Sequence, residues 1–100
     1  MPGVYPLNHT FALAENASAT PPGDTIWPGG TGMFTGEATF GGGGTITLQV
    51  LTPNGTWVAV GSDTTLTAAG AAGFILPNGA RIRASIATAT AVFAYASQMP

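Results

Sequence analysis

Closely spaced Gly, Pro and Asn residues divide the chain beyond residue 32 into short runs of Thr, Val, Ile and aromatic residues. The breakers GGGG, TPNG, GSD, AGAAG and PNGA recur throughout this part, and no helical period is present. β-Branched and aromatic residues favour strands. We therefore expect an all-β domain, a small β-sandwich or jelly-roll-like barrel, because short and evenly spaced strands are typical of these folds.

The expected strands lie between the breakers. They cover residues 32–40, 45–51, 56–60, 64–68, 73–77, 81–87 and 91–97. The glycine tract 41–44 is expected in a loop or at a strand end, because Gly loses more conformational entropy in a strand than other residues do.

The first 32 residues differ from the rest because prolines punctuate them: Pro2, Pro6, Pro21, Pro22 and Pro28. Proline donates no amide hydrogen, which argues against a long helix or a central strand. Residues 10–18 would form at most a marginal short helix. We expect an extended N-terminal arm over residues 1–32, lying on another surface, and a sandwich domain over 33–100 that folds even when residues 1–26 are deleted. The apolar anchors of the arm would be Val4, Tyr5, Leu7, Phe11, Leu13, Ile26 and Trp27.

Residues 45–60 are expected to form a hairpin around TPNG. Pro53 suits the second position of a type I turn, and Gly55 accepts a positive φ at no steric cost. A three-residue loop then pairs Thr52 with Thr56. In this register the core face carries Ile46, Leu48, Val50, Val58 and Val60.

Trp57 then falls on the opposite face, beside Gln49, Leu51 and Ala59. A four-residue loop would instead pair Val50 with Trp57 and bury the indole, but the turn chemistry favours the first register. Leu51 and Trp57 would lie outward with no charge around them, as expected of a surface that meets another subunit or the arm. The alternatives are that both faces are buried within one sandwich, or that Trp57 caps its rim.

Charge is scarce, since only 6% of residues are charged against roughly 25% in typical soluble domains. Lysine is absent, and the two cations, Arg81 and Arg83, share one strand face while Ile82 points to the other. We expect one Arg to pair internally with Glu37 or Asp63, and the other to bind carboxylates of a neighbouring protein through its planar fork. The net charge of −2 offers no basic footprint for nucleic acid.

Catalytic or metal-binding groups are few. His9 is the only histidine and Cys is absent, which excludes the usual zinc sets, and no GK[ST] follows GGGG. The four carboxylates are expected to be isolated from one another and exposed to solvent. They are Glu15, Asp24, Glu37 and Asp63. The uncharged stretch 84–97 is shorter than the roughly 20 residues of a membrane-spanning helix. We therefore expect no enzyme, no cofactor, no metal and no membrane.

The order of several motifs resembles a family of viral proteins. WPGG at residues 27–30 is followed by GMFTGEATFGGGG, TITLQVLTPNGTWVAVG, TTLTAAGAAGFILPNGA, RIRASI and YAS. This pattern over residues 27–98 is similar to small β-sandwich virion proteins of tailed bacteriophages, of the head decoration or cement type. The motifs that carry the resemblance are structural rather than catalytic.

The resemblance implies a protein on the outer capsid surface of the virion that commonly trimerises and clamps neighbouring major capsid proteins. An extended terminus would reach across a subunit boundary. The alternatives are a carbohydrate- or receptor-binding module of a head or tail fibre, with a glycan held by Trp57 and Gln49, or a tail or connector component. The protein-interface candidates are Tyr5, Leu7, Phe11, Trp27, Leu51, Trp57, Arg81 and Arg83.

Overall fold

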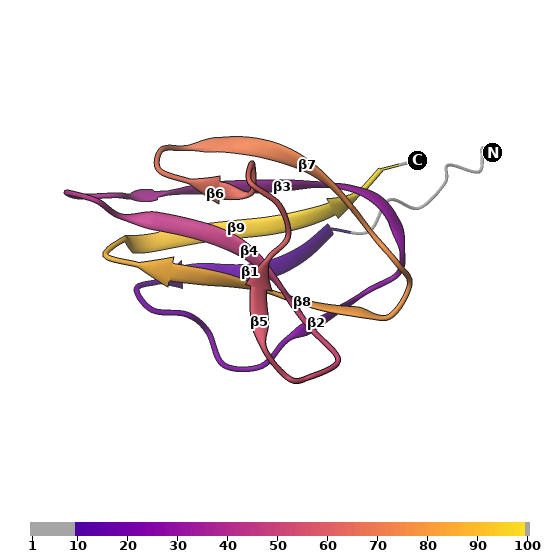
Figure 1. Ribbon diagram of the computed structural model, residues 1–100. Helices are drawn as coiled ribbons and strands as arrows, with labels where there is room; N and C mark the ends of the chain where they lie inside the picture. Colours follow the sequence, from indigo (N-terminus) through magenta and orange to yellow (C-terminus); the bar gives the residue numbers. More distant parts are fainter. Residues whose placement is uncertain (1–9, 100) are drawn as a thin grey trace.

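The computed structural model describes residues 10–99, which form nine strands in two packed antiparallel sheets (Figure 1). The strands are β1 (Thr10–Ala17), β2 (Thr25–Trp27), β3 (Gly30–Thr39), β4 (Thr45–Leu51), β5 (Trp57–Ala59), β6 (Thr65–Leu66), β7 (Gly70–Leu76), β8 (Ala80–Ala87) and β9 (Thr90–Gln98). The four-stranded sheet has the order β1-β9-β3-β7, and the five-stranded sheet has the order β2-β8-β4-β5 with β6 beside β4. Within these residues no helix is long and apolar enough to cross a membrane.

Strand pairing is nested along the chain. β1 pairs with β9, β2 with β8, β3 with β7, and β4 with β6. The chain therefore resembles one long hairpin with its tip near β5. Successive strand pairs of this hairpin belong alternately to the four-stranded and the five-stranded sheet. This connectivity is that of a jelly roll. The expected all-β sandwich is therefore confirmed.

The strands expected beyond residue 32 are all present. β4 has the expected bounds. The largest difference at a strand start is in β7, which begins at Gly70, three residues before the expected Gly73. Gly70 pairs with Gly36 at the edge of its sheet, where a residue without a side chain is tolerated. The glycine tract forms the β3–β4 turn, and Gly41 and Gly43 have positive φ angles of 57° and 81°.

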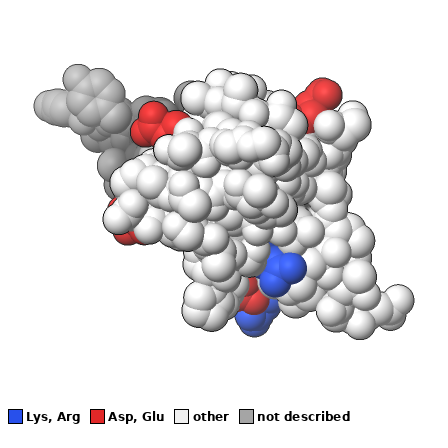
Figure 2. All heavy atoms as spheres, turned by 90° about the vertical axis from the view of Figure 1, so that its left-hand side faces the viewer, with Lys and Arg blue, Asp and Glu red and all other residues white. Residues whose placement is uncertain are grey.

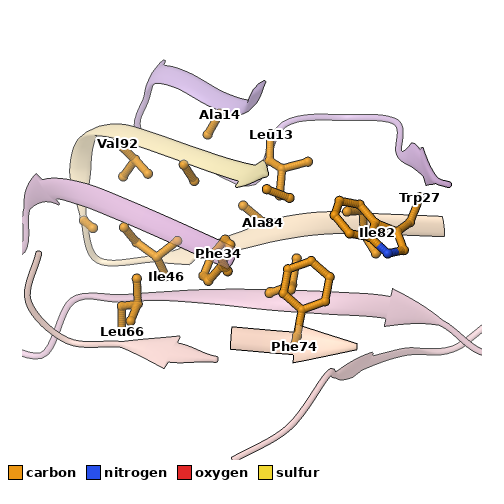
Figure 3. Packing of buried hydrophobic residues seen from close by; sticks show 14 residues of the cluster. Leu13, Ala14, Trp27, Phe34, Ile46, Leu66, Phe74, Ile82, Ala84 and Val92 are labelled. Atoms are coloured by element: carbon orange, nitrogen blue, oxygen red, sulfur yellow. The ribbon is translucent and has the colours of Figure 1, made fainter. Parts of the chain in front are cut away.

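The core lies between the sheets. Its largest fully buried apolar side chains are Trp27, Phe34, Ile46, Leu48, Ile82 and Val92. Figure 3 shows Trp27 beside Ile82 at one end of this cluster, and Ile46 and Val92 toward the other.

Trp27 joins the two sheets. It belongs to β2 of the five-stranded sheet, yet its indole packs against two rings of the other sheet. The ring centroids are 5.9 Å apart for Phe11 and 4.9 Å apart for Phe74. These two rings come from β1 and β7, the two edge strands of the four-stranded sheet. The central strand β3 contributes Gly32 at this point, where a Cβ would lie 2.6 Å from atoms of both Trp27 and Phe74. The missing side chain thus provides the space for the indole.

The expected N-terminal arm is wrong for the residues that the structure describes. β1 and β2 are the outer partners of β9 and β8, and Trp27 is fully buried within its own chain. Prolines remain compatible with this arrangement because Pro21, Pro22 and Pro28 lie outside the strands. Both strands also lie at sheet edges, where the demands of the hydrogen-bond ladder are lower. Val4, Tyr5 and Leu7 lie outside the described residues.

Deletion of residues 1–26 should therefore abolish folding, contrary to the expectation from the sequence. The truncation removes β1 and most of β2, together with Phe11, Leu13 and Ala14 of the core. Circular dichroism during a urea titration measures this outcome. A truncated chain that retained β-sheet signal and a cooperative transition would show that the two strands are dispensable.

Gly32→Ala should lower the free energy of unfolding by about 1–3 kcal/mol, because the added methyl group overpacks the core against Trp27. The matched control is Gly61→Ala. Its Cβ would meet nothing within 4 Å, and we expect a change within about 0.5 kcal/mol. Urea unfolding of both variants, followed by tryptophan fluorescence, gives the comparison. Equal stabilities would show that the indole can move aside without loss.

Candidate protein-binding face

The β4–β5 hairpin has the register that its turn predicts. The Gly55 amide donates to the Thr52 carbonyl at 2.8 Å, and the Thr52 amide donates to the Thr56 carbonyl at 2.8 Å. Gly55 has a φ of 83°, as expected for the residue that closes this loop. Val50 pairs with Val58, and Leu51 pairs with Trp57. The alternative register that buries the indole is therefore wrong.

One part of the hairpin prediction is not met. Ile46 and Leu48 are fully buried, but Val58 is 41% exposed. β5 has only three residues and is the last strand of its sheet. Val58 therefore lies on the expected side of β5, opposite Val50, but stays exposed at the edge of its sheet.

Trp57, Gln49 and Arg83 form a cluster on the outer face of the five-stranded sheet. Arg83 is paired with Gln49 across β8 and β4, and its Nε donates to the Gln49 Oε1 at 2.8 Å. The Arg83 guanidinium carbon lies 4.4 Å from the Trp57 ring centroid. Such a contact is worth about 0.5–1 kcal/mol at a partly exposed site. It holds the planar guanidinium against the indole.

Within residues 10–99, the two terminal amino groups of Arg83 have no hydrogen-bond partner. The Nε atom is occupied by Gln49, and the guanidinium plane is held by Trp57. The remaining N–H groups are therefore donors in a fixed fork. A fork of this kind matches the two oxygens of a carboxylate.

Arg81 has a carboxylate partner in its own chain. Its Nη1 atom lies 3.2 Å from the Asp24 Oδ2 and 3.3 Å from the Asp24 Oδ1. Asp24 directly precedes β2, whose Ile26 pairs with Arg81. The Arg81 side chain is 53% exposed, so the ion pair contributes little, about 0.2–1 kcal/mol at most.

The internal pairing expected for one arginine is thus confirmed, but the partner is Asp24 rather than Glu37 or Asp63. Glu37 lies on β3 of the other sheet, and Asp63 lies in the β5–β6 loop. Figure 2 shows the two blue arginine side chains close together with a red carboxylate between them, while the other red groups lie apart.

The structure divides the interface candidates into two groups. Leu51, Trp57, Arg81 and Arg83 share the outer face of the five-stranded sheet. Phe11 is half-buried and Trp27 is buried, and both pack in the core, so the expectation that they contact another protein is corrected. Tyr5 and Leu7, like His9, lie outside the described residues.

A second outer surface was not foreseen. On the four-stranded sheet, β9 turns Phe93 and Tyr95 outward, whereas its small neighbours Ala94 and Ala96 are fully buried. Ile75 of β7 is 72% exposed. The sequence signal was the alternation in AVFAYAS, but this pattern does not say whether alanines or rings face the core. In this sheet the alanines do, because large residues from facing strands fill the space.

Comparisons of the chain with protein-family models, with curated proteins and with solved structures found no match.

The two tryptophans should respond differently to truncation. Trp57→Ala should cost about 1–2 kcal/mol of stability, because it removes the Arg83 contact and a half-buried ring. Trp27→Ala should cost about 3–5 kcal/mol, because it empties the space between the sheets. Chemical denaturation of the two variants measures both values. Similar losses would show that Trp57 has a structural role equal to that of Trp27.

Proposed function

We propose that this chain is a non-enzymatic structural protein that binds other proteins in the manner of a head decoration, or cement, protein on the outer capsid surface of a tailed phage. The partner would be the major capsid protein. The chain would also associate with itself as a homotrimer, as the resemblance to decoration proteins implies. The proposal combines the sequence resemblance with the two outer faces of the jelly roll.

The observation that carries the proposal is the Arg83–Trp57 cluster in its weakly charged surroundings. Within the described part of the chain, Arg83 keeps two terminal amino groups available, and Trp57 and Leu51 supply half-buried apolar surface beside them. A charged fork surrounded by apolar and aromatic side chains is the composition of protein–protein hot spots, in which Trp and Arg are enriched. A carboxylate of a partner would complete the hydrogen bonds of Arg83.

The exposed apolar side chains support binding to protein rather than exposure to water. Ile26 is 57% exposed on β2, and Ile75 is 72% exposed on the other sheet. Each large side chain that a partner covers fully contributes about 1.5–3 kcal/mol. On a repeating lattice, several such contacts in one oligomer add through effective concentration, so modest individual contacts suffice.

The jelly roll itself is compatible with two of the functions considered. Viral capsid proteins and lectins both use this architecture, and a fold alone does not establish function. The glycan alternative needs an open aromatic face and a free amide. The guanidinium covers one face of Trp57, and the Gln49 Oε1 atom already accepts a hydrogen bond from Arg83. The cluster therefore fits a protein carboxylate better than a sugar ring.

Heads of the phage that encodes this chain, prepared without it, provide the test. Purified protein should co-sediment with the heads, and electron cryomicroscopy should place it on the outer capsid surface. Arg83→Gln and Trp57→Ala should weaken binding about tenfold or more, because the first removes the guanidinium fork and the second removes the ring that holds it. Arg81→Gln serves as the matched control, since Arg81 already pairs with Asp24.

Three results would contradict the proposal. The wild-type chain could fail to bind heads, could bind only along the tail, or could be retained on a glycan array in a Trp57-dependent manner. The second result would favour a tail or connector component, and the third would favour a carbohydrate-binding module.

A further inference from the structure

A hollow of about 270 Å³ opens on the outer face of the four-stranded sheet, on the opposite side of the molecule from the Arg83–Trp57 cluster. Its lining includes Thr35, Glu37, Ala69, Gly70, Phe93 and Tyr95. We call it the Glu37 hollow. It combines one carboxylate with two aromatic rings.

Strand register explains why the hollow forms here. Glu37 pairs with Phe93, and Thr35 pairs with Tyr95, so two rings of β9 stand along one side of β3. On the other side, β7 begins only at Gly70, which is preceded by Ala69. Large side chains on one flank and small ones on the other leave a depression beside the carboxylate.

Among residues 10–99, no cation forms an ion pair with the Glu37 carboxylate. Within the same residues the Glu37 side chain forms no hydrogen bond, and it is exposed. Both arginines of the chain lie on β8 of the opposite sheet, where Asp24 and the Trp57–Gln49 pair hold them. Within the described part of the chain, the hollow therefore presents an unpaired negative charge next to two aromatic rings.

This combination attracts a cation in two ways. The carboxylate offers a charge-assisted hydrogen bond to an ammonium or guanidinium group. The rings of Phe93 and Tyr95 line the hollow and can take up cation–π contacts, each worth about 0.5–1 kcal/mol at an exposed site. Small-molecule sites usually occupy about 300–1,000 Å³, so a hollow below that range suits the end of one side chain better than a whole ligand.

We propose that the Glu37 hollow binds the cationic end of an arginine or lysine side chain that a different protein presents. The inference rests on the proposed function, to which it adds the chemistry of a second contact. A second copy of this chain is a poorer occupant, because it has no lysine and its arginines lie on the opposite face. A contact between opposite faces is heterologous, and it stacks copies into an open filament unless the rotation between them closes a ring.

A titration of the full chain with a single charged probe tests the site without any phage particle. The probe is N-acetyl-arginine amide, and its matched control is N-acetyl-citrulline amide, which has nearly the same shape and no charge. Nuclear magnetic resonance of ¹⁵N-labelled protein at constant ionic strength should show the arginine probe shifting the amide signals of residues 35–37 and 93–95. The citrulline probe should bind about tenfold more weakly, as expected when the charge-assisted contact is lost.

Variants identify the groups responsible. Glu37→Gln keeps the side-chain shape and should raise the dissociation constant of the arginine probe about tenfold. Phe93→Leu should also raise it, whereas Tyr95→Phe keeps the ring and should leave it unchanged. Unchanged signals elsewhere in each spectrum verify the fold. Equal binding of both probes, no shift at these residues, or an unaltered Glu37→Gln variant would overturn the inference.

Binding to heads separates this inference from the proposed function. If the wild-type chain binds no heads while the probe titration succeeds, the proposed function fails and the cation site stands. If heads bind the wild type and Glu37→Gln equally, the partner does not use the hollow and the inference fails. Loss of self-association in Glu37→Gln, measured by light scattering, would assign the hollow to a second copy and would also overturn it.

Discussion

The packing of Trp27 over Gly32 is the contact on which the rest of the sandwich depends. The indole lies between the two sheets and touches rings from both edge strands of the opposite sheet. Its Nε1 atom donates to the Gly30 carbonyl at 3.2 Å, so the only polar atom of the side chain is satisfied in the core. A side chain on Gly32 would occupy the same space. The large side chain of Trp27 and the missing side chain of Gly32 therefore set the distance between the two sheets at this end of the core.

The same contact organises the ends of neighbouring strands. The Trp27 carbonyl accepts a hydrogen bond from the Gly79 amide at 2.8 Å, which ties the β7–β8 turn to β2. A Cβ on Gly29 would lie 2.9 Å from the Asn78 nitrogen, so the WPGG and PNG segments fit together only without it. Both segments thus serve packing in this structure.

Charge is distributed unevenly over the two outer faces. The five-stranded sheet carries both arginines, and the four-stranded sheet carries Glu37 beside two rings. The cations are held in defined positions by Asp24, Gln49 and Trp57. With so few charges on the surface, each one has a large influence on which partner can approach and in what orientation. Both proposed contacts use one of these few charges: a fixed guanidinium in one case, and in the other a carboxylate without an ion pair among residues 10–99.

Local chemistry was enough to locate the strands beyond residue 32 and the hairpin turn at TPNG, because turns and strand propensity depend on neighbouring residues. It also placed Trp57 on an outward face and the two arginines together on one face of their strand. It did not recognise β1 and β2 as strands of the sandwich, since their partners β9 and β8 lie at the far end of the chain and edge strands leave a weak pattern. The partners of the arginines and the outward rings of β9 likewise depend on residues distant in sequence. Only folding brings those residues together. Which side chains of a strand face the core depends on the space left between the two sheets, because protein interiors are closely packed.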